Sequence, residues 1–329
     1  MKISVILFFI LFVINSQLLA SSKIKVGSSP VLSSAGLYLA EKMGYFKDEG
    51  LDVEISDFAT SGAAMTLLLS KGNLDVGAGN LTSGLFNAIL NGENFKLVAD
   101  KGHVEKGKEY MQLVVRKDHL DSKRYKTIKD LKEFKIGITA IDGVSQQIVI
   151  DMFLKSVGLN DSSIEYIKMS YAEMNIALKT KNIDAAIQIE PFLTKALQKG
   201  YISIVSSTAD IHPNQQSAAL FYSPKFMKRK KDAVKFMKAY LRGVRAYNQA
   251  ISGSNPEIVT ELKKIFKIED SEWIEMRPVG LHDDGHLNTK DLLSDLAWYK
   301  EKGFLPRVPL ESEVIDSYFF TEANKTLSK

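Results

Sequence analysis

The chain has 329 residues, of which 45% are hydrophobic and 25% charged, a balance typical of a soluble globular protein with room for two domains. It contains no cysteine, which excludes structural disulfides, a cysteine nucleophile, thiolate metal sites and a lipoprotein anchor. The formal net charge is +4, and the one dense basic run, residues 228–231, is interpreted as a solvated helix start, so nucleic-acid binding is not expected.

Residues 1–22 have the layout of a secretory signal peptide. Lys2 is basic, residues 3–14 are an apolar run apart from Ser4, and small residues follow at positions 20–22. The run is shorter than the roughly 20 residues that a membrane span needs. We expect cleavage after Ala20 or Ser22, with an uncleaved N-terminal anchor as the alternative.

The next segment predicts a βαβ unit. A strand over 24–27 precedes a loop of small residues, a helix over 36–43 and a strand over 51–55. Two strands joined in this way are parallel, with a right-handed crossover. The loop then meets the helix N-terminus at the carboxyl edge of the sheet, where ligands bind and where anions are favoured. Ser33 or Ser34 is expected to cap this helix.

Strands and helices continue to alternate as far as about residue 205. The further expected strands are 74–79, 96–99, 111–116, 135–138, 164–169, 183–187, 202–205 and 218–222, and the expected helices are 65–70, 85–90, 128–131, 142–157, 172–180, 193–198, 231–252, 256–266 and 291–302. This order predicts two α/β lobes and a largely helical C-terminal part that returns to the first lobe. We expect lobe I to comprise 23–112 and 215–329, and lobe II 113–214.

Common catalytic signatures do not occur in the chain. It lacks G-x-S-x-G, G-x-x-x-x-G-K-[ST], G-x-G-x-x-G and H-E-x-x-H. His282 and His286 are spaced like metal ligands on a helix, but the Asp-Asp-Gly between them favours a turn. Glu190 has no acid or base partner that the sequence identifies. We therefore expect no enzyme activity, no metal and no cofactor.

Five short loops instead present polar groups where a strand meets a helix. Four are rich in Ser, Thr, Gly and Asn, and the fifth carries an acid and an aromatic ring; they are 33–36, 61–63, 80–84, 142–145 and 190–192. Such loops suit the reversible binding of a small polar molecule between two lobes. The alternative is that they are ordinary βα loops.

Several motifs together resemble the periplasmic solute-binding components of ABC importers, in the nitrate/sulfonate/taurine branch that also includes binders of thiamine-pyrimidine precursors. They are AGLYLA at 35–40, GYF at 44–46, EGLDV at 49–53, DVG at 75–77 with Asn80, LVVRK at 113–117, DLK at 130–132, EPF at 190–192, SP at 223–224, YLRG at 240–243 and the stretch 280–285. The resemblance implies the type II periplasmic-binding-protein fold, with two lobes, each a mainly parallel sheet flanked by helices, that close on a ligand and dock on a membrane permease.

Ligand contacts are also implied by this resemblance. They fall on Ser33, Ser34, Ser61, Gly62, Asn80, Thr82, Gly143, Ser145, Glu190 and Phe192. The expected protein is a monomer that is free in the periplasm, takes a small-molecule ligand and has the permease subunits as partners.

The ligand is expected to be a small organic anion or a zwitterion, because uncharged polar groups and helix N-termini line the predicted site. If Glu190 faces the cleft, it should accept a hydrogen bond from an N–H or ammonium group of the ligand. The alternative is a rim acid that pairs with a lysine of its own chain. An aminopyrimidine precursor of thiamine is the second ligand class. A pyrimidine-synthesising enzyme and a sensor input domain are the other functions considered.

Overall fold

The computed structural model describes residues 23–58 and 63–327. The predicted signal peptide, Ser61 and Gly62 lie outside these residues. No helix in the described ranges is long and apolar enough to cross a membrane.

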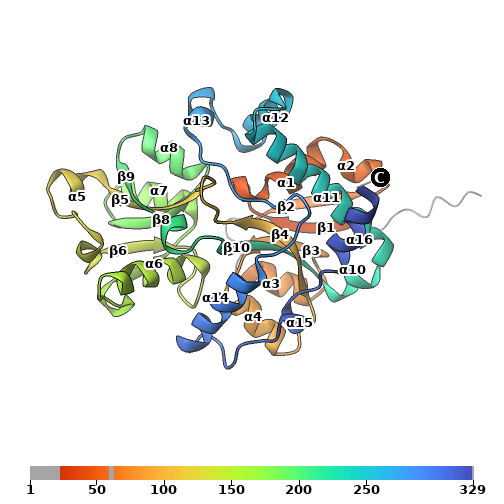
Figure 1. Ribbon diagram of the computed structural model, residues 1–329, viewed down its shortest axis with the longest axis horizontal. Helices are drawn as coiled ribbons and strands as arrows, with labels where there is room; N and C mark the ends of the chain where they lie inside the picture. Colours follow the sequence, from red (N-terminus) through yellow and green to blue (C-terminus); the bar gives the residue numbers. More distant parts are fainter. Residues whose placement is uncertain (1–22, 59–62, 328–329) are drawn as a thin grey trace, which may run out of the picture.

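The described chain forms two five-stranded sheets, which lie side by side (Figure 1). The first sheet has the order β2-β1-β3-β10-β4 and contains β1 (Ile24–Ser28), β2 (Val53–Asp57), β3 (Val76–Asn80), β4 (Lys96–His103) and β10 (Gln216–Tyr222). The second has the order β7-β6-β8-β5-β9 and contains β5 (Met111–Arg116), β6 (Lys135–Ile138), β7 (Glu165–Lys168), β8 (Ala185–Ile189) and β9 (Ile202–Ser207). The predicted two-lobed α/β fold is thereby confirmed. We call the two halves lobe I and lobe II.

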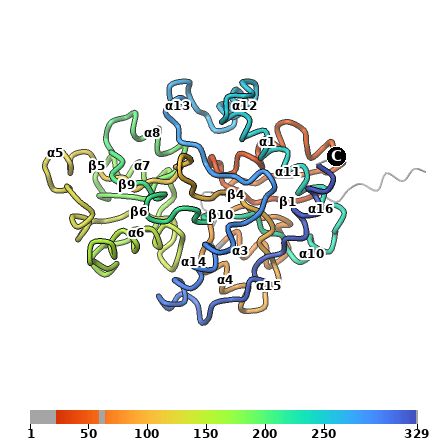
Figure 2. Tube along the Cα trace, in the orientation of Figure 1, coloured from red at the N-terminus to blue at the C-terminus, as the bar shows by residue number. Residues whose placement is uncertain are grey.

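Each sheet is mainly parallel, as predicted, and contains one antiparallel strand. In lobe I, β1 pairs in parallel with β2 and β3, whereas β10 is antiparallel to both of its neighbours. Lobe II repeats the arrangement, with β5 antiparallel to β8 and β9. Both antiparallel strands lie next to the points where the chain passes between the lobes, after β4 and before β10 (Figure 2). A strand that arrives from the other lobe is not bound to the direction that βαβ crossovers impose.

Helices flank both sheets. Around lobe I they are η1 (Leu32–Ser34), α1 (Ala35–Lys42), α2 (Tyr45–Asp48), α3 (Ala63–Ser70), α4 (Ser83–Leu90), α10 (Pro224–Lys228), α11 (Lys230–Ile251), α12 (Pro256–Phe266), α13 (Asp270–Glu275), α14 (Thr289–Glu301), α15 (Glu311–Val314) and α16 (Tyr318–Leu327). Around lobe II they are α5 (Lys117–Asp121), η2 (Ile128–Leu131), α6 (Ser145–Ser156), η3 (Asp161–Ser163), α7 (Tyr171–Lys179), α8 (Phe192–Gln198) and α9 (Thr208–Ile211).

Helix α11 packs closely across α1. A Cβ atom on Gly243 would come within 2.0 Å of the carbonyl oxygen of Gly36, and one on Gly36 within 2.6 Å of Val244. Only glycine allows the two backbones to approach so closely. This contact fixes the C-terminal helices on the first βαβ unit, whose loop forms part of the site described below.

Helix α14 connects the C-terminal part of the chain to lobe II. Trp298 Nε1 donates to Asp151 of α6 at 2.7 Å, and Lys302 Nζ lies 2.9 Å from the same carboxylate and 2.8 Å from that of Asp161. In Figure 1, α14 lies along the border between the lobes. The predicted boundaries at 112/113 and 214/215 assign this helix to lobe I, and they stay a prediction.

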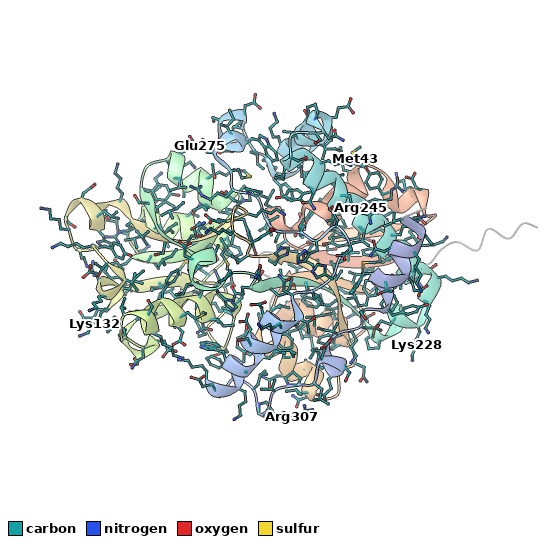
Figure 3. All side chains as sticks on the ribbon, viewed as in Figure 1. Met43, Lys132, Lys228, Arg245, Glu275 and Arg307 are labelled. Carbon is teal, nitrogen blue, oxygen red and sulfur yellow. The ribbon has the colours of Figure 1, made fainter. Side chains whose placement is uncertain are left out.

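The basic run at 228–231 is the solvated helix start that the sequence predicts. Lys230 begins α11, and Lys228, Lys230 and Lys231 are exposed. Figure 3 shows Lys228 at the periphery, as it does Lys132 and Arg307, far apart from one another. These three cations therefore do not gather into one patch.

Candidate functional site

Three parallel strands of lobe I end at the edge that meets lobe II. Strand β1 ends at Ser28 and β3 at Asn80, and β4 carries Lys101 near its end. Asn80 Nδ2 donates to the hydroxyl of Tyr171, a lobe II residue, at 3.2 Å. The carboxyl edge that the sequence predicts as the ligand site is therefore part of the boundary between the lobes.

The serine loop after β1 is held by its own hydrogen bonds. The Ser28 hydroxyl donates to Ser34 Oγ at 3.1 Å, and Ser34 Oγ donates to the Ser29 carbonyl at 2.8 Å. Ser34 precedes α1, but neither its side chain nor that of Ser33 caps the helix. Ser34 is the N-cap residue of α1, as predicted, but its hydroxyl bonds back into the loop and not to the helix, and Ser33 lies inside the short helix η1.

Ser33 instead contacts a buried lysine that the sequence interpretation missed. Lys101 is 1% exposed, and its Nζ donates to Ser33 Oγ at 3.0 Å. Burial lowers the pKa of Lys101 to about 7, and the charge of Asp100 opposes this only in part. The sequence predicts that this strand ends at Ala99, but β4 continues to His103. Predicting a longer strand would have placed Lys101 inside the sheet and drawn attention to it.

Two further hydroxyl groups lie beside this pair. Tyr110 OH and Ser217 Oγ are 2.5 Å apart, and Ser217 Oγ donates to the Gly102 carbonyl at 2.8 Å. A Cβ on Gly102 would be 2.9 Å from Ser33 Cβ and 3.5 Å from Tyr110 OH. We call Ser33, Lys101, Tyr110 and Ser217 the polar cluster; it lies where both crossing segments leave lobe I.

Lobe II contributes an aromatic pair. The rings of Tyr171 and Phe192 are nearly parallel, with centroids 6.3 Å apart. Tyr171 hydrogen bonds with Asn80 of lobe I and interacts with Thr139 of lobe II. Asn80 and Phe192, both predicted ligand contacts, are thus brought to one tyrosine.

The two lobes also contact each other at a second place. Thr82 and Val144 form an isolated antiparallel bridge, and the Ser83 amide donates to the Gly143 carbonyl at 3.0 Å. The Ser83 hydroxyl also donates to the carbonyl of Asp142. We call these residues, 82–83 and 142–144, the interlobe latch. The two lobes therefore meet directly through their strand-end loops.

The side chains around the latch are already engaged within the protein. Thr82 Oγ1 accepts from Leu85 N at 3.3 Å and caps α4. The Ser145 side chain is buried, and its carbonyl accepts from Gln215 Nε2 at 3.1 Å. Both contacts order the strand-end loops, and they leave ligand binding by Thr82 and Ser145 a prediction.

A cavity of about 740 Å³ opens beside the latch. Its lining comes from both lobes and includes Thr66, Ser70, Asn87, Thr139, Lys168 and Phe304. Thr139 also interacts with Tyr171, which touches Asn80, so one lining residue connects the cavity to the lobe boundary. Its volume falls within the range of small-molecule sites.

Glu190 is completely buried and bonded to its own chain. One carboxylate oxygen accepts from Thr194 N at 3.0 Å, and the other from Thr194 Oγ1 at 2.8 Å and from Arg277 N at 3.2 Å. Burial raises its pKa to about 7, against the lowering effect of these bonds. These hydrogen bonds are neither the expected contact with a ligand nor the expected pair with a lysine. The side chain joins α8 to the segment around Arg277.

The remaining cluster of histidines does not have the geometry of a metal centre. Asp100, His103 and His282 bring metal-ligating atoms within 4.8 Å of one another. However, the two rings are stacked with centroids 4.0 Å apart and planes 14° apart, so their nitrogen lone pairs do not converge. Residues between His282 and His286 form the predicted turn, not a helix. We interpret this cluster as a support for the end of β4.

The predicted ligand residues thus divide into groups by their environment. Ser33 belongs to the polar cluster, Asn80 and Phe192 contact Tyr171, Thr82 and Gly143 form the latch, Ser34, Ser145 and Glu190 are buried in internal contacts, and Ser61 and Gly62 lie outside the described residues. Direct contact of each with a ligand stays a prediction.

Comparison with known proteins relates this fold to solute-binding proteins. A ligand-binding component of an ABC-type import system from Staphylococcus aureus, with zinc bound, superimposes with a TM-score of 0.76 at 17% identity over 92% of this chain and 98% of that chain. The alkanesulfonate-binding protein SsuA from Xanthomonas axonopodis, bound to MOPS, gives 0.72 at 14% identity over 90% and 98%. The nitrate-binding protein NrtA from Synechocystis gives 0.75 at 16% identity over 93% and 89%.

These likenesses establish the fold rather than the solute, because the desulfurization enzyme DszB also shares it. No curated protein matches the sequence. The NMT1-like family matches residues 19–261, about three quarters of the chain. This agrees with the resemblance to the nitrate and sulfonate branch, and the chain belongs to the NMT1-like family.

Proposed function

We propose that this protein is the extracytoplasmic substrate-binding component of an ABC importer, and that it captures a small organic anion or zwitterion. The observation that carries the proposal is the direct contact between the lobes, where the latch joins strand-end loops and lines a cavity. A clamp of this kind encloses a solute by hinge motion and needs no reactive group.

The ligand class is supported by the chemistry of this boundary. Its polar groups are mainly hydroxyls and amides, and Lys101 adds one buried cation. A sulfonate or carboxylate fits such donors, and a taurine-like zwitterion would place its ammonium group away from Lys101. The thiamine-precursor pyrimidine remains the second candidate, since the facing rings of Tyr171 and Phe192 suit a planar ligand.

Export and partners form part of the same proposal. A cleavable signal peptide over 1–22 would deliver the protein to the periplasm without a lipid anchor, where it would work as a monomer with membrane permease subunits. Permease and ATPase genes beside this gene are expected. Recovery of the protein by osmotic shock, with an N-terminus near Ser21 or Lys23, would support the location. Retention of Met1 in a cytosolic protein would contradict it.

The direct test is a thermal-shift screen of sulfonates, carboxylates, amino acids, nitrate and pyrimidines. A solute at 100 times its Kd should stabilise the folded state by about 2.7 kcal/mol, which a melting curve resolves. Isothermal titration should then give one site per chain. Stabilisation by pyrimidines alone would favour the second candidate. Chemical turnover of the bound compound would favour an enzyme, and the absence of any stabilising compound would count against a binding protein.

A further inference from the structure

The feature that the proposed function leaves open is why a lysine is buried at the lobe boundary. Lys101 has a 1% exposed side chain in a position where lysine is rarely found. An isolated ammonium group in such a place is costly unless it is paired with an anion or loses its proton. The contacts of the Lys101 ammonium group therefore indicate which kind of chemical group would bind beside it.

The ammonium group has donors to spare. Within residues 23–58 and 63–327, Ser33 Oγ is the hydrogen-bond partner of Lys101 Nζ, and no carboxylate lies within ion-pair distance of it. An ammonium group has three N–H donors, so two remain. The low pKa of Lys101 agrees with this lack of a counter-ion.

The neighbouring acid does not supply the missing charge. Strand β4 is irregular against β10 at this point, because Asp100 pairs with Ala219 and Gly102 with Ala218, which leaves Lys101 between them. No hydrogen bond or ion pair joins Asp100 to Lys101 in the described residues. The Asp100 carboxylate is already occupied by four N–H donors at 2.8–2.9 Å. These are Gly102 N, Gln216 Nε2, His103 Nδ1 and His282 N. The Asp100 carboxylate is thereby engaged with these donors rather than with Lys101.

The Ser33 hydroxyl completes a two-point donor site. Its oxygen accepts from Lys101, and its own O–H has no acceptor within residues 23–58 and 63–327, so it can donate to a further group. Ser33 lies in the loop after β1, at the strand-end edge that faces lobe II. An oxyanion there could accept from both groups at once, with charge-assisted bonds.

We infer that Lys101 is the specificity-determining residue of this site, and that its ammonium group, together with the Ser33 hydroxyl, binds the singly charged oxyanion of the solute. The inference rests on the proposed function and narrows it. It selects carboxylates and sulfonates, zwitterions among them, over neutral pyrimidines and over cations, which Lys101 would repel.

The test compares matched pairs of probes on matched variants. The probes are alkanesulfonates and alkanoates and their neutral sulfonamides and amides, measured by isothermal titration at pH 7. The variants are Lys101→Met, Ser33→Ala and Lys96→Met. Lys96 lies on the same strand, but its Nζ bonds to the carbonyls of Ser312 and Glu313, away from the lobe boundary.

The wild type should bind the best anion at least about 30-fold more tightly than its neutral analogue. Lys101→Met should lose at least about 30-fold in affinity for that anion, since removing one partner of a buried charge pair is costly. It should leave the neutral analogue unaffected. Ser33→Ala should lose about fivefold to tenfold for the anion, and Lys96→Met should bind like the wild type.

Circular dichroism and thermal unfolding will show whether each variant is folded. If Lys101→Met is unfolded, Ser33→Ala carries the test. Unchanged anion affinity in a folded Lys101→Met protein, or a wild type that prefers neutral or cationic solutes, would overturn the inference while leaving a solute-binding protein. Failure of the wild type to bind any solute of the wider screen would overturn the proposed function itself.

Discussion

Two buried ionisable side chains, Lys101 and Glu190, lie at the lobe boundary and have different roles. Both oxygens of Glu190 accept hydrogen bonds from Thr194 and from the Arg277 backbone, so this carboxylate holds parts of the protein together. Lys101 has one partner, Ser33, among the described residues. The residue with the incomplete set of partners is the better candidate for contact with a ligand.

The environment of Glu190 predicts a distinct effect of pH on stability. Its pKa is raised from 4.5 to about 7 in the folded protein, chiefly by burial. Between these values the folded state binds more protons than the unfolded state, so stability should fall as pH rises through this window and level off above about pH 7. Glu190→Gln cannot titrate. Urea unfolding of both proteins at pH 4.5–8 should therefore show the wild type losing stability relative to the variant by up to about 1.4 kcal/mol per pH unit.

Glu173→Gln is the matched control. The hydrogen bonds from Ser170 lower the pKa of Glu173, so its contribution to stability should be lost only as pH falls below about 4.5. The difference curve for this variant should be flat from pH 5 to 8. A curve for Glu190→Gln that is equally flat would show that Glu190 titrates normally in the folded protein.

At the scale of elements, the crossing of α1 and α11 fixes the first strand-end loop. The crossing depends on the absence of a Cβ at Gly243, because the nearest obstacle would be the Gly36 carbonyl in the backbone of α1. A backbone atom cannot turn aside as a flexible side chain can. The periodicity of residues 231–252 predicts the helix α11. The contact of Gly243 with Gly36 is seen only in the folded structure.

Gly243→Ala should therefore destabilise the protein by about 3 kcal/mol, at the upper end of overpacking costs. Gly84→Ala, in helix α4, is the control, because a Cβ there would meet only Thr82 Oγ1 at 3.9 Å. Alanine at a helical position without a clash should be neutral or stabilising by up to about 1 kcal/mol. Chemical unfolding of the two variants measures the difference. Equal stabilities would contradict the role of the close crossing.

On the scale of the whole molecule, the latch is where closure can be tested. Gly143 has φ of +98°, and a Cβ there would lie 2.8 Å from Ser83 Cβ across the lobe boundary. A side chain at this position is strained in its backbone and obstructs the facing lobe. The effect should fall on closure, since Gly143 lies at the surface between the lobes rather than in either core.

Gly143→Ala should weaken solute binding about tenfold, because a smaller fraction of molecules reaches the closed form. Small-angle scattering should show a smaller radius of gyration for the wild type with saturating solute than without it, and a smaller change for the variant. Gly158→Ala is the control, since Gly158 has φ of +77° but nothing within 4 Å of its Cβ position. Scattering curves of the wild type that do not change with solute would contradict a hinged clamp.

The order and type of most elements, and the two-lobed fold, could be predicted from the amino-acid sequence. The repeated strand–loop–helix pattern has local causes, namely apolar periodicity, Gly and Pro punctuation and strand-end loops rich in small polar residues. It also indicated the edges at which the lobes meet, since parallel strands bring their carboxyl ends together. The family motifs along the chain added the relationship to solute-binding proteins.

The role of each polar side chain, in contrast, depends on contacts between distant parts of the chain. Whether a serine caps a helix or holds a loop, as Ser34 does, depends on a partner brought in by the fold. Glu190 meets the Arg277 backbone across 87 residues, and Lys101 meets Ser33 across 68. The mixed sheets likewise follow from strands that return from the other lobe. The burial and the hydrogen-bond partners of a side chain depend on contacts between residues far apart in the sequence. Local sequence patterns do not predict such contacts.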